Sequence, residues 1–259
     1  MTADVLSGLP PRWRADRLLC GDRSRWAEVE PNGDDSGVLL VLRAHGQPGV
    51  SLLGRGLGPT VDRLVLAAVE SERFDAVRWM SVPRTCRPSA QTLDALRLAP
   101  FSTWDWMASD TVPDIVPGED LVRRLDPVLD AAAIRSCLAE SNPRTSADPT
   151  AASEVGWWGV GDDGRLDGVV GVTARSGRGT GTSWHLHGLG VRPASRGRGL
   201  GAALTAVATR SGLTLGAEWV SLGLYEENHT ARRLYERLGY RTEAEFVSFA
   251  PKGADRPPA

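Results

Sequence analysis

Residues 191–202 read VRPASRGRGLGA, and this stretch decides the fold of the chain. The preceding residues, 183–191, have the pattern of a buried strand, and those from Gly199 onward have the spacing of a helix. Between them lies a basic bend whose glycines let the backbone approach a bound anion. A helix that starts at such a bend adds N–H groups and the positive end of its dipole. The stretch therefore predicts a strand, a bend able to hold a diphosphate, and a helix.

A second informative segment, residues 228–240, reads NHTARRLYERLGY. Its spacing predicts a helix that Asn228 caps and that ends at Gly239, a residue typical of helix C-termini. Tyr235 lies four residues after Ala231, so both occupy one face of this helix. The segment can offer an amide and a phenol to the ligand that the glycine bend holds.

The bend is also compatible with a dinucleotide site or with a plain turn. Gly197, Gly199 and Ala202 match the dinucleotide fingerprint G-x-G-x-x-G/A, with Glu218 as the acid that would bind ribose. However, five residues separate the strand from the first glycine, and Glu218 precedes its strand instead of ending it. The plain turn would be a tight one that only feeds a helix. Neither the dinucleotide site nor the plain turn explains why the segment at 228–240 follows the bend at this spacing.

The pattern Arg196-x-x-Gly199-x-Gly201, preceded by Leu189-x-Val191, resembles motif A of the GNAT acetyltransferases. The segment at 228–240 resembles motif B of the same superfamily, in which an Asn-x-x-Ala-x-x-x-Tyr helix ends in Gly and an aromatic residue. The resemblance covers about residues 119–249. It implies an α/β (α+β) fold with a mixed, mainly antiparallel sheet flanked by helices. The sheet is splayed between the strand ending at Val191 and the strand at 219–224, and acetyl-CoA lies in the gap.

The resemblance also implies roles for individual residues. The strand backbone pairs with the pantetheine arm of acetyl-CoA, the bend holds the pyrophosphate, and the last helix faces the pantetheine and the thioester. Tyr235 is the implied acid for the departing thiolate. The implied acetyl-CoA-binding residues are Leu189, Gly190, Val191, Arg196, Gly197, Arg198, Gly199, Leu200, Gly201, Ala202, Asn228, Ala231 and Tyr235.

Two histidines precede the bend, His185 and His187. Residues two apart share a face of a strand, so both imidazoles are expected on one side. An imidazole with an ordinary pKa of about 6.5 suits a general base at neutral pH. The run resembles the His-x-His-x-Leu-x-Val strand of arylalkylamine N-acetyltransferases, which implies a proton relay from the amine through both histidines. Which of the two is the base stays open, as does a purely structural role.

An internal sequence repeat predicts two related halves. GRGLG at 54–58 recurs at 197–201, and each copy is followed by a helix, a strand and a second helix: 61–70, 77–81 and 91–98 in the first, and 203–211, 218–222 and 230–238 in the second. The expected organisation is a degenerate GNAT-like domain over 1–118, a catalytic domain over 119–249 and a flexible tail over 250–259. Leu53 stands where Arg196 stands in the second copy. This tandem arrangement also resembles mycothiol synthase.

Within the second half, the patterns predict further elements. Strands are expected at 121–125, 157–161, 168–173, 183–191, 219–224 and 244–249, a helix at 127–140 with Leu129, Ala133 and Cys137 on one face, and a turn at Asp162-Asp163-Gly164. Acceptor specificity is expected from the polar loop 141–153 and from Trp157, Trp158 and Trp184, unless these tryptophans are core residues.

Composition limits the remaining possibilities. The net charge of −2 argues against nucleic acid as a partner, and no apolar run approaches the length of a membrane span. Three scattered cysteines without a CxxC pair, and histidines without a third ligand at suitable spacing, indicate neither disulfides nor a metal site. We expect a cytoplasmic protein, monomeric or homodimeric.

The sequence thus predicts an acetyl-CoA-dependent N-acetyltransferase that acts on a primary amine of a small molecule or peptide. The alternatives are a non-catalytic acyl-CoA-binding sensor or scaffold and, from the dinucleotide fingerprint, a nicotinamide-dependent oxidoreductase.

Overall fold

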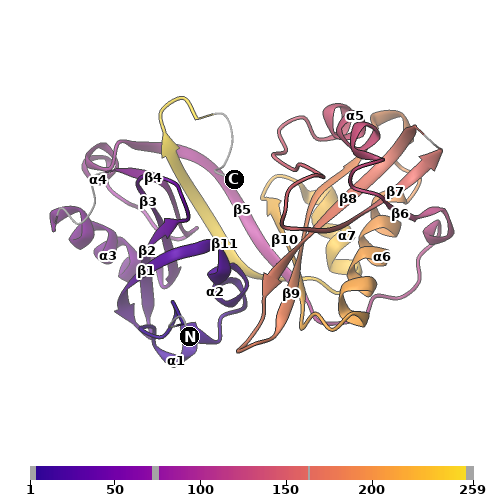
Figure 1. The fold of residues 1–259 in the computed structure, drawn as a ribbon. Helices are drawn as coiled ribbons and strands as arrows, with labels where there is room; N and C mark the ends of the chain where they lie inside the picture. The colour runs from indigo at the N-terminus through magenta and orange to yellow at the C-terminus, as the bar shows by residue number, and fades with distance from the viewer. Residues whose placement is uncertain (1–3, 72–75, 163, 255–259) are drawn as a thin grey trace. The chain divides into compact units, whose positions relative to one another are not determined.

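The structure is a computed structural model that describes residues 4–71, 76–162 and 164–254. Its helices and strands form two units: unit 1 holds residues 1–106 and 244–259, and unit 2 holds residues 107–243 (Figure 1). The units divide within two long strands, β5 (Leu98–Ser109) and β11 (Arg241–Pro251), because each strand supplies residues to both. The sequence placed the boundary at 118/119 instead, where prolines and a glycine interrupt the patterns.

Unit 1 is a mixed sheet with helices. Its hydrogen-bonded strand order is β1-β2-β3-β4-β11-β5, in which β3 and β4 are parallel and the described neighbours β1–β2, β2–β3 and β4–β11 are antiparallel. The elements are α1 (Pro11–Arg14), α2 (Arg17–Asp22), β1 (Trp26–Asp34), β2 (Gly37–Ala44), β3 (Val50–Gly56), α3 (Gly58–Glu70), β4 (Val77–Pro83) and α4 (Ala90–Ala95). Its core joins the buried face of α3 (Val61, Val65 and Ala68) to apolar side chains of the strands.

Unit 2 continues the order β5-β10-β9-β8-β7-β6. β6, β7, β8 and β9 pair antiparallel, and β9 and β10 pair parallel, as the crossover helix between them requires. The elements are β6 (Arg123–Leu125), α5 (Ala131–Ser141), β7 (Glu154–Asp162), β8 (Arg165–Ser176), β9 (Thr182–Val191), α6 (Leu200–Thr214), β10 (Val220–Tyr225) and α7 (His229–Arg237). The fold of unit 2 is therefore α/β, with a mixed sheet flanked by helices.

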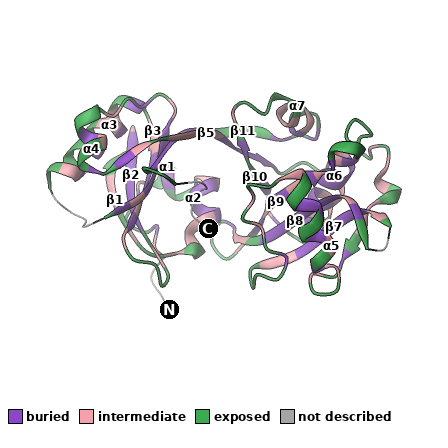
Figure 2. Cartoon of the chain, turned by 90° about the horizontal axis from the view of Figure 1, so that it is seen from above, coloured by how far each residue is buried: buried purple, intermediate pink, exposed green. Residues whose placement is uncertain are grey.

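The sheet of unit 2 has a separate core on each face. One core holds side chains of α6 with Trp158, Val170 and Leu186 of the strands. The other holds Ile134 and Cys137 of α5 with strand residues that alternate with the first set, such as Trp157 and Val169. Figure 2 shows the buried residues concentrated along the strands, while the helices carry exposed residues on their outer sides. Because alternate strand residues point to opposite faces, each face has its own chemistry. We call them the α6 face and the α5 face.

Most elements predicted for unit 2 are confirmed, with shifted ends. The helix predicted at 127–140 begins only at Ala131, because Asp126 accepts hydrogen bonds from the N–H groups of Val128 and Leu129 and holds them in a turn. Leu129 is 85% exposed and precedes the helix, so the prediction that it shares a helix face with Ala133 and Cys137 was wrong. Of the predicted strand 121–125, only Arg123–Leu125 forms a strand, β6.

Three further predictions concern a helix end, the C-terminal tail and a turn. The helix predicted at 91–98 stops at Ala95, since Arg97 has a φ of +57° and Leu98 opens β5. Ala250 and Pro251, expected in a flexible tail, belong to β11. The predicted turn at 162–164 and the tail beyond 254 include residues outside the described ranges.

The echoed glycines occupy different places in the two units. Gly54 and Gly56 lie inside β3, paired with Leu39 and Gly37 of β2, and only Leu57 separates β3 from α3. In unit 2, by contrast, residues 192–199 lie between the end of β9 and the start of α6. The same five letters therefore form a strand end in unit 1 and a protruding bend in unit 2.

The α6 core makes a stability prediction. Leu204 of α6 is fully buried, whereas Leu215 at the end of the same helix is 70% exposed. Leu204→Ala should cost about 2–5 kcal/mol and lower the thermal unfolding midpoint by roughly 5–15 °C. Leu215→Ala should shift the midpoint by no more than about 2 °C, since exposed substitutions change stability little. Equal shifts in calorimetry would contradict this packing.

Candidate active site

The parallel ladder between β9 and β10 is short. It joins Trp184, His185 and Leu186 to Val220, Ser221 and Leu222, and β9 then runs on to Val191. Leu189 O accepts a bond from Asn142 Nδ2 at 3.5 Å, and Val191 O accepts one from Arg196 Nε at 3.1 Å. The carbonyls of Leu189 and Val191 point away from β8. The bond to β8 at this end of the strand comes from the Arg192 N–H, which donates to Asp167 O. The edge of β9 beyond Leu186 is therefore open to a ligand that adds like a strand.

A bulge in β9 sets which side chains face which core. The register with β8 shifts between Val169 and Gly171, and Gly188 has a φ of +58°, which favours glycine. The extra residue reverses the alternation, so Leu189 packs with Leu186 in the α6 core although it is three residues later. As a result, Gly190 faces α5 and Leu189 faces α6.

The glycine bend presents main-chain donors. Gly197 and Gly199 have φ values of +77° and +79°, and Gly199 forms the N-cap of α6 without a side-chain cap. Across the described parts of the chain, no acceptor is recorded for the N–H groups of residues 197–201, whereas Ala202 and Ala203 donate to Gly199 O. An ideal Cβ at Gly197 would meet nothing within 4 Å. Exposed, unpaired amides at a helix N-terminus fit a diphosphate.

The two arginines of the bend differ in their contacts. Arg196 bonds Val191 O and Ser141 O, so its guanidinium braces the bend against β9 and the end of α5. Arg198 is 59% exposed and lies 3.9 Å from Asp167. Of the two, Arg198 has the freer guanidinium to meet a phosphate.

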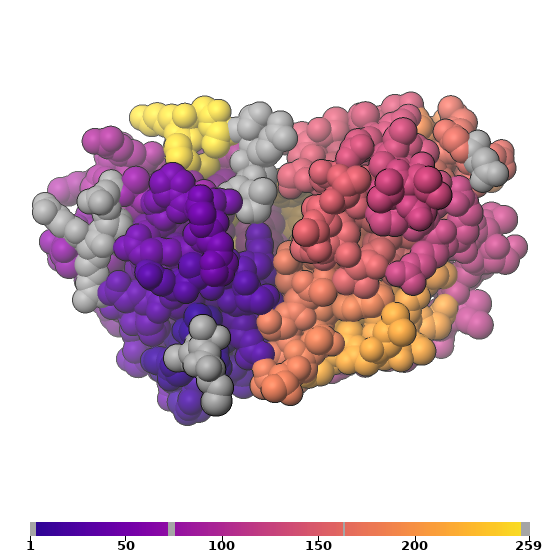
Figure 3. All heavy atoms as spheres, in the orientation of Figure 1, coloured from indigo at the N-terminus to yellow at the C-terminus, as the bar shows by residue number. Residues whose placement is uncertain are grey.

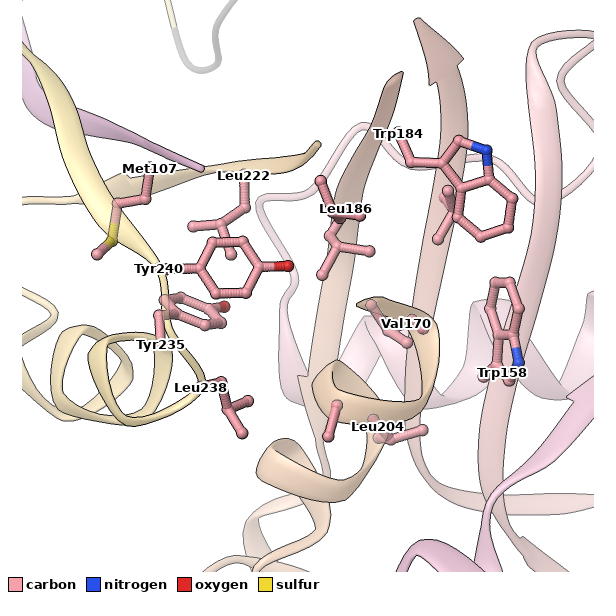
Figure 4. Packing of buried hydrophobic residues seen from close by; sticks show 14 of the residues in the cluster. Met107, Trp158, Val170, Trp184, Leu186, Leu204, Leu222, Tyr235, Leu238 and Tyr240 are labelled. Carbon is pink, nitrogen blue, oxygen red and sulfur yellow. The ribbon is translucent and has the colours of Figure 1, made fainter. Parts of the chain in front are cut away.

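The two site residues predicted for helix α7 differ in exposure. Asn228 is exposed, and its Oδ1 caps the helix by accepting the Ala231 N–H at 3.1 Å. Tyr235 is buried in the α6 core with its ring 5.8 Å from that of Tyr240 (Figure 4). Tyr240 Oη bonds Thr209 Oγ1 at 2.6 Å, but none of the described residues is recorded as a partner of Tyr235 Oη. Burial raises the pKa of Tyr235 above its ordinary value, so the phenol stays protonated.

The histidines lie on the α5 face. They alternate with Trp184 and Leu186 of the α6 core, and His187 packs edge-on against Trp157. Their ring nitrogens bond different strands: His185 Nδ1 lies 3.0 Å from Ser221 Oγ of β10, and His187 Nε2 lies 3.0 Å from a carboxylate oxygen of Glu154 on β7. The pair and Tyr235 are thus on opposite faces of the sheet, and the β9–β10 ladder ends at Leu186, one residue after His185.

Comparison with known proteins gives a family for this region. Residues 129–240 match the acetyltransferase (GNAT) family. The chain is 48% identical over 61 residues to the mycothiol acetyltransferase of Parafrankia sp. (24% of this chain, 19% of that protein) and 41% identical over 69 residues to that of Nocardiopsis dassonvillei (27% and 21%). The chain thus matches about a fifth of the length of these curated relatives.

A solved structure extends the likeness to the whole fold. The GCN5-related N-acetyltransferase from Kribbella flavida has a TM-score of 0.54 and 20% identity, covering 98% of this chain and 97% of its own. At this identity the match establishes the GNAT-like fold. The family model and the names of both relatives describe acetyltransferases.

The candidate site also contains residues that sequence patterns did not reveal. Glu154, Thr173 and Ser221 come from three separate strands, yet the register aligns them beside His185 on the α5 face. No local motif marks them, because cross-strand neighbours are set by pairing. The tryptophans expected to bind the acceptor are core residues instead: Trp157 is fully buried and Trp158 is 5% exposed.

The surface above the α5 face comes from α5 and the loop after it. Ala147 of this loop packs close to Gly188, and Arg135 of α5 bonds Asp148 and Thr150. In the space-filling view, the magenta and pink atoms of this part of the chain form much of the face of unit 2 turned to the viewer (Figure 3). The loop expected to determine acceptor specificity therefore covers the side that carries the histidines.

Other site types receive no support from the described residues. Within them, no group of three or more His, Cys, Asp or Glu is arranged to hold a metal ion. The cysteines Cys20, Cys86 and Cys137 are buried and unpaired by disulfides. None of the described helices combines the length and apolar character needed to cross a bilayer.

The bend gives a binding prediction. Gly199 and Gly216 flank α6, both have positive φ, and neither has a close neighbour for a Cβ. Gly199→Val should weaken acetyl-CoA binding at least about tenfold, since the bend must distort to relieve a β-branched residue at positive φ. Gly216→Val carries the same strain away from the bend and should bind normally in calorimetry. Retained affinity in Gly199→Val would exclude the bend as the phosphate site.

Proposed function

We propose that the chain is an acetyl-CoA-dependent N-acetyltransferase that transfers the acetyl group directly to a primary amine of a small molecule or peptide. The observation that carries the proposal is the row of N–H groups at 197–201, for which no acceptor is recorded among the described residues and which starts α6 beside the edge of β9 beyond the β9–β10 ladder. Such donors suit the diphosphate of coenzyme A, and the strand edge suits the amide groups of pantetheine.

The binding roles follow from these positions. Main-chain groups of Leu189, Gly190 and Val191 would hold the pantetheine arm, and the amides from Gly197 to Ala202 the diphosphate. Asn228 serves as the cap of α7, which fixes the helix that carries Tyr235. Arg196 would act indirectly, because it holds the bend in place.

The chemistry needs one base and one acid. A histidine of the 185/187 pair takes a proton from the ammonium form of the acceptor, and the resulting amine attacks the thioester carbon. The C–N bond forms and the C–S bond breaks, with an N–H near Leu189 or Val191 stabilising the oxyanion. Tyr235 gives its proton to the sulfur and is restored by the second proton of the nitrogen. The products are the amide and the coenzyme A thiol, and one proton is released to solvent.

Tyr235 must act in a concerted step. A phenol with a pKa raised by burial is a weaker acid than an ordinary thiol, so a free thiolate would not deprotonate it. Proton transfer that accompanies C–S cleavage avoids this difficulty. The orientation of the ring in the α6 core, fixed by packing beside Tyr240, makes such a transfer possible.

We infer further that unit 1 is a degenerate relative of unit 2, so that the chain is a tandem GNAT protein. Both units run strand, helix, parallel strand, helix, strand. In unit 1, however, the amide of Leu57 bonds Ser36 O, and Thr85 lies against Gly58 at the start of α3. Its own chain thus fills the place where a phosphate would bind.

A thiol-release screen tests the function. Acetyl-CoA is supplied with amines, amino acids, aminoglycosides and peptide N-termini, and release of the coenzyme A thiol is followed. We expect release with at least one primary amine. Saturable acetyl-CoA binding without thiol release across the panel would overturn catalysis and leave an acyl-CoA-binding protein.

The acid gives a second kinetic prediction. Tyr235→Phe should lower kcat by roughly 10–10³, because the proton donor for sulfur is lost and water replaces it poorly. Tyr240→Phe is the matched control: it removes a buried hydroxyl bonded to Thr209, so it should lower stability and leave kcat nearly unchanged. Unchanged kcat in Tyr235→Phe would remove this phenol from the reaction.

A further inference from the structure

The α5 face carries a row of polar side chains across four strands. Glu154 of β7 pairs with Thr173 of β8, Thr173 pairs with His185 of β9, and His185 pairs with Ser221 of β10. Directly paired residues project from the same face of a sheet. The row lies one residue before the β9–β10 ladder ends, so it borders the open edge where the thioester is expected.

His187 joins the row by reaching over a glycine. It pairs with Gly171 of β8, and its ring extends across that strand to the carboxylate of Glu154 on β7. A Cβ built on Gly171 would lie 2.7 Å from His187 Cε1, too close for any side chain. The missing side chain at Gly171 is therefore what allows the imidazole–carboxylate contact.

The contact fixes the proton positions on His187. Glu154 Oε1 and Oε2 lie 3.0 and 3.1 Å from Nε2, and the carboxylate side chain is only 6% exposed. A carboxylate only accepts, so Nε2–H donates and a neutral ring keeps its lone pair on Nδ1. Across the described ranges no partner is recorded for Nδ1, and the His187 side chain is 19% exposed.

The two histidines differ in the recorded neighbours that would stabilise a positive charge on the imidazole ring. Ser221 Oγ lies 3.0 Å from His185 Nδ1 and 3.2 Å from Trp184 O, and it is a neutral neighbour of His185. His187 instead has a buried carboxylate against it. A base becomes cationic when it accepts a proton, and an adjacent carboxylate stabilises the imidazolium and holds the ring in one tautomer.

Thr173 supplies an independent sign of a polar ligand. It is 7% exposed, lies between Glu154 and His185 in the row, and its Oγ1 has no partner among the described residues. A buried hydroxyl without a partner is costly, and native proteins rarely leave such a group unsatisfied without a reason. A ligand N–H donated to Oγ1 provides one.

We propose that the polar row is the amine site, in which His187 Nδ1 accepts the proton of the acceptor ammonium, Glu154 positions His187, and Thr173 Oγ1 accepts a second N–H. This rests on the proposed function and names its base. The N–H bond of the ammonium breaks, its electron pair stays on nitrogen, and the proton forms the second N–H of the imidazolium. The ligand class is a primary ammonium group, since one N–H is used by Nδ1 and another by Thr173.

The test reads the histidines by nitrogen-15 NMR at about pH 8, above the ordinary imidazole pKa. The chain has four histidines, so a His187→Asn variant identifies the signal. We expect His187 to carry an exchange-protected proton on Nε2 and none on Nδ1. Glu154→Leu should abolish the protection and Glu154→Gln should restore it, because the amide oxygen can accept the same bond. A proton on Nδ1 of the native protein, or unchanged protection in Glu154→Leu, would overturn the assignment.

The ligand is probed with butylamine in the presence of coenzyme A, which has no acetyl group to transfer. Saturable shifts of His187 Nδ1 are expected, with a half-saturation at least about tenfold higher in the isosteric Thr173→Val variant. Tetramethylammonium, which has no N–H, should give no shift. Equal shifts with both cations, or no effect of Thr173→Val, would overturn the site.

Glu218→Gln serves as the control for loss of a carboxylate, since Glu218 bonds the loop at Arg178 away from the row. It should leave both the Nε2 protection and the butylamine response unchanged. Neither spectrum requires turnover. A protein that releases no thiol from acetyl-CoA can therefore still show the Glu154–His187 pair, and an active enzyme can lack it, so the two failures are distinguishable.

Discussion

The short ladder between β9 and β10 is the constraint on which the site depends. Two parallel strands joined by a crossover helix normally pair along their length, but here pairing covers three residues of each strand. Beyond Leu186 the main chain of β9 has lost its neighbour on one side. Its carbonyls at Leu189 and Val191 accept bonds from the side chains of Asn142 and Arg196. The same divergence leaves room for the long bend that precedes α6.

The bulge at Gly188 gives that opening its two different sides. By adding one residue to β9, it turns Leu189 and Val191 toward α6 and Gly190 toward α5. Before the bulge, the histidines point toward α5, whereas Tyr235 belongs to the α6 core. The proposed base and the proposed acid therefore lie on opposite faces of the sheet. This suits a reaction in which the nucleophile and the leaving group lie on different sides of one carbonyl carbon.

The two glycine-rich copies show that a motif acts through its place in the fold. In unit 2 the bend is exposed and its amides lack acceptors among the described residues. In unit 1 the same letters end a strand, Arg55 is bound to Asp16, and Gly58 is packed against Thr85. Because glycine has no side chain, a neighbouring group can approach its backbone closely. In unit 1 that group is the chain itself.

The sequence by itself determined the strand, bend and helix around residues 183–214, the final helix with its Asn228 cap, and the two histidines on one face, since each depends on local spacing and capping. It did not reveal β1, β2, β3 or β5, or the extension of β11 to Pro251; the continuous apolar run of β2, for example, fits a buried helix as well as a buried strand. Only the tertiary structure decided that Glu154 reaches His187 across Gly171 and that Thr173 lies beside them with no partner among the described residues. The physical reason is that strand register joins residues far apart in the chain, such as His187 and Glu154 at a separation of 33 positions, and register is fixed by the burial of whole faces and not by any short motif.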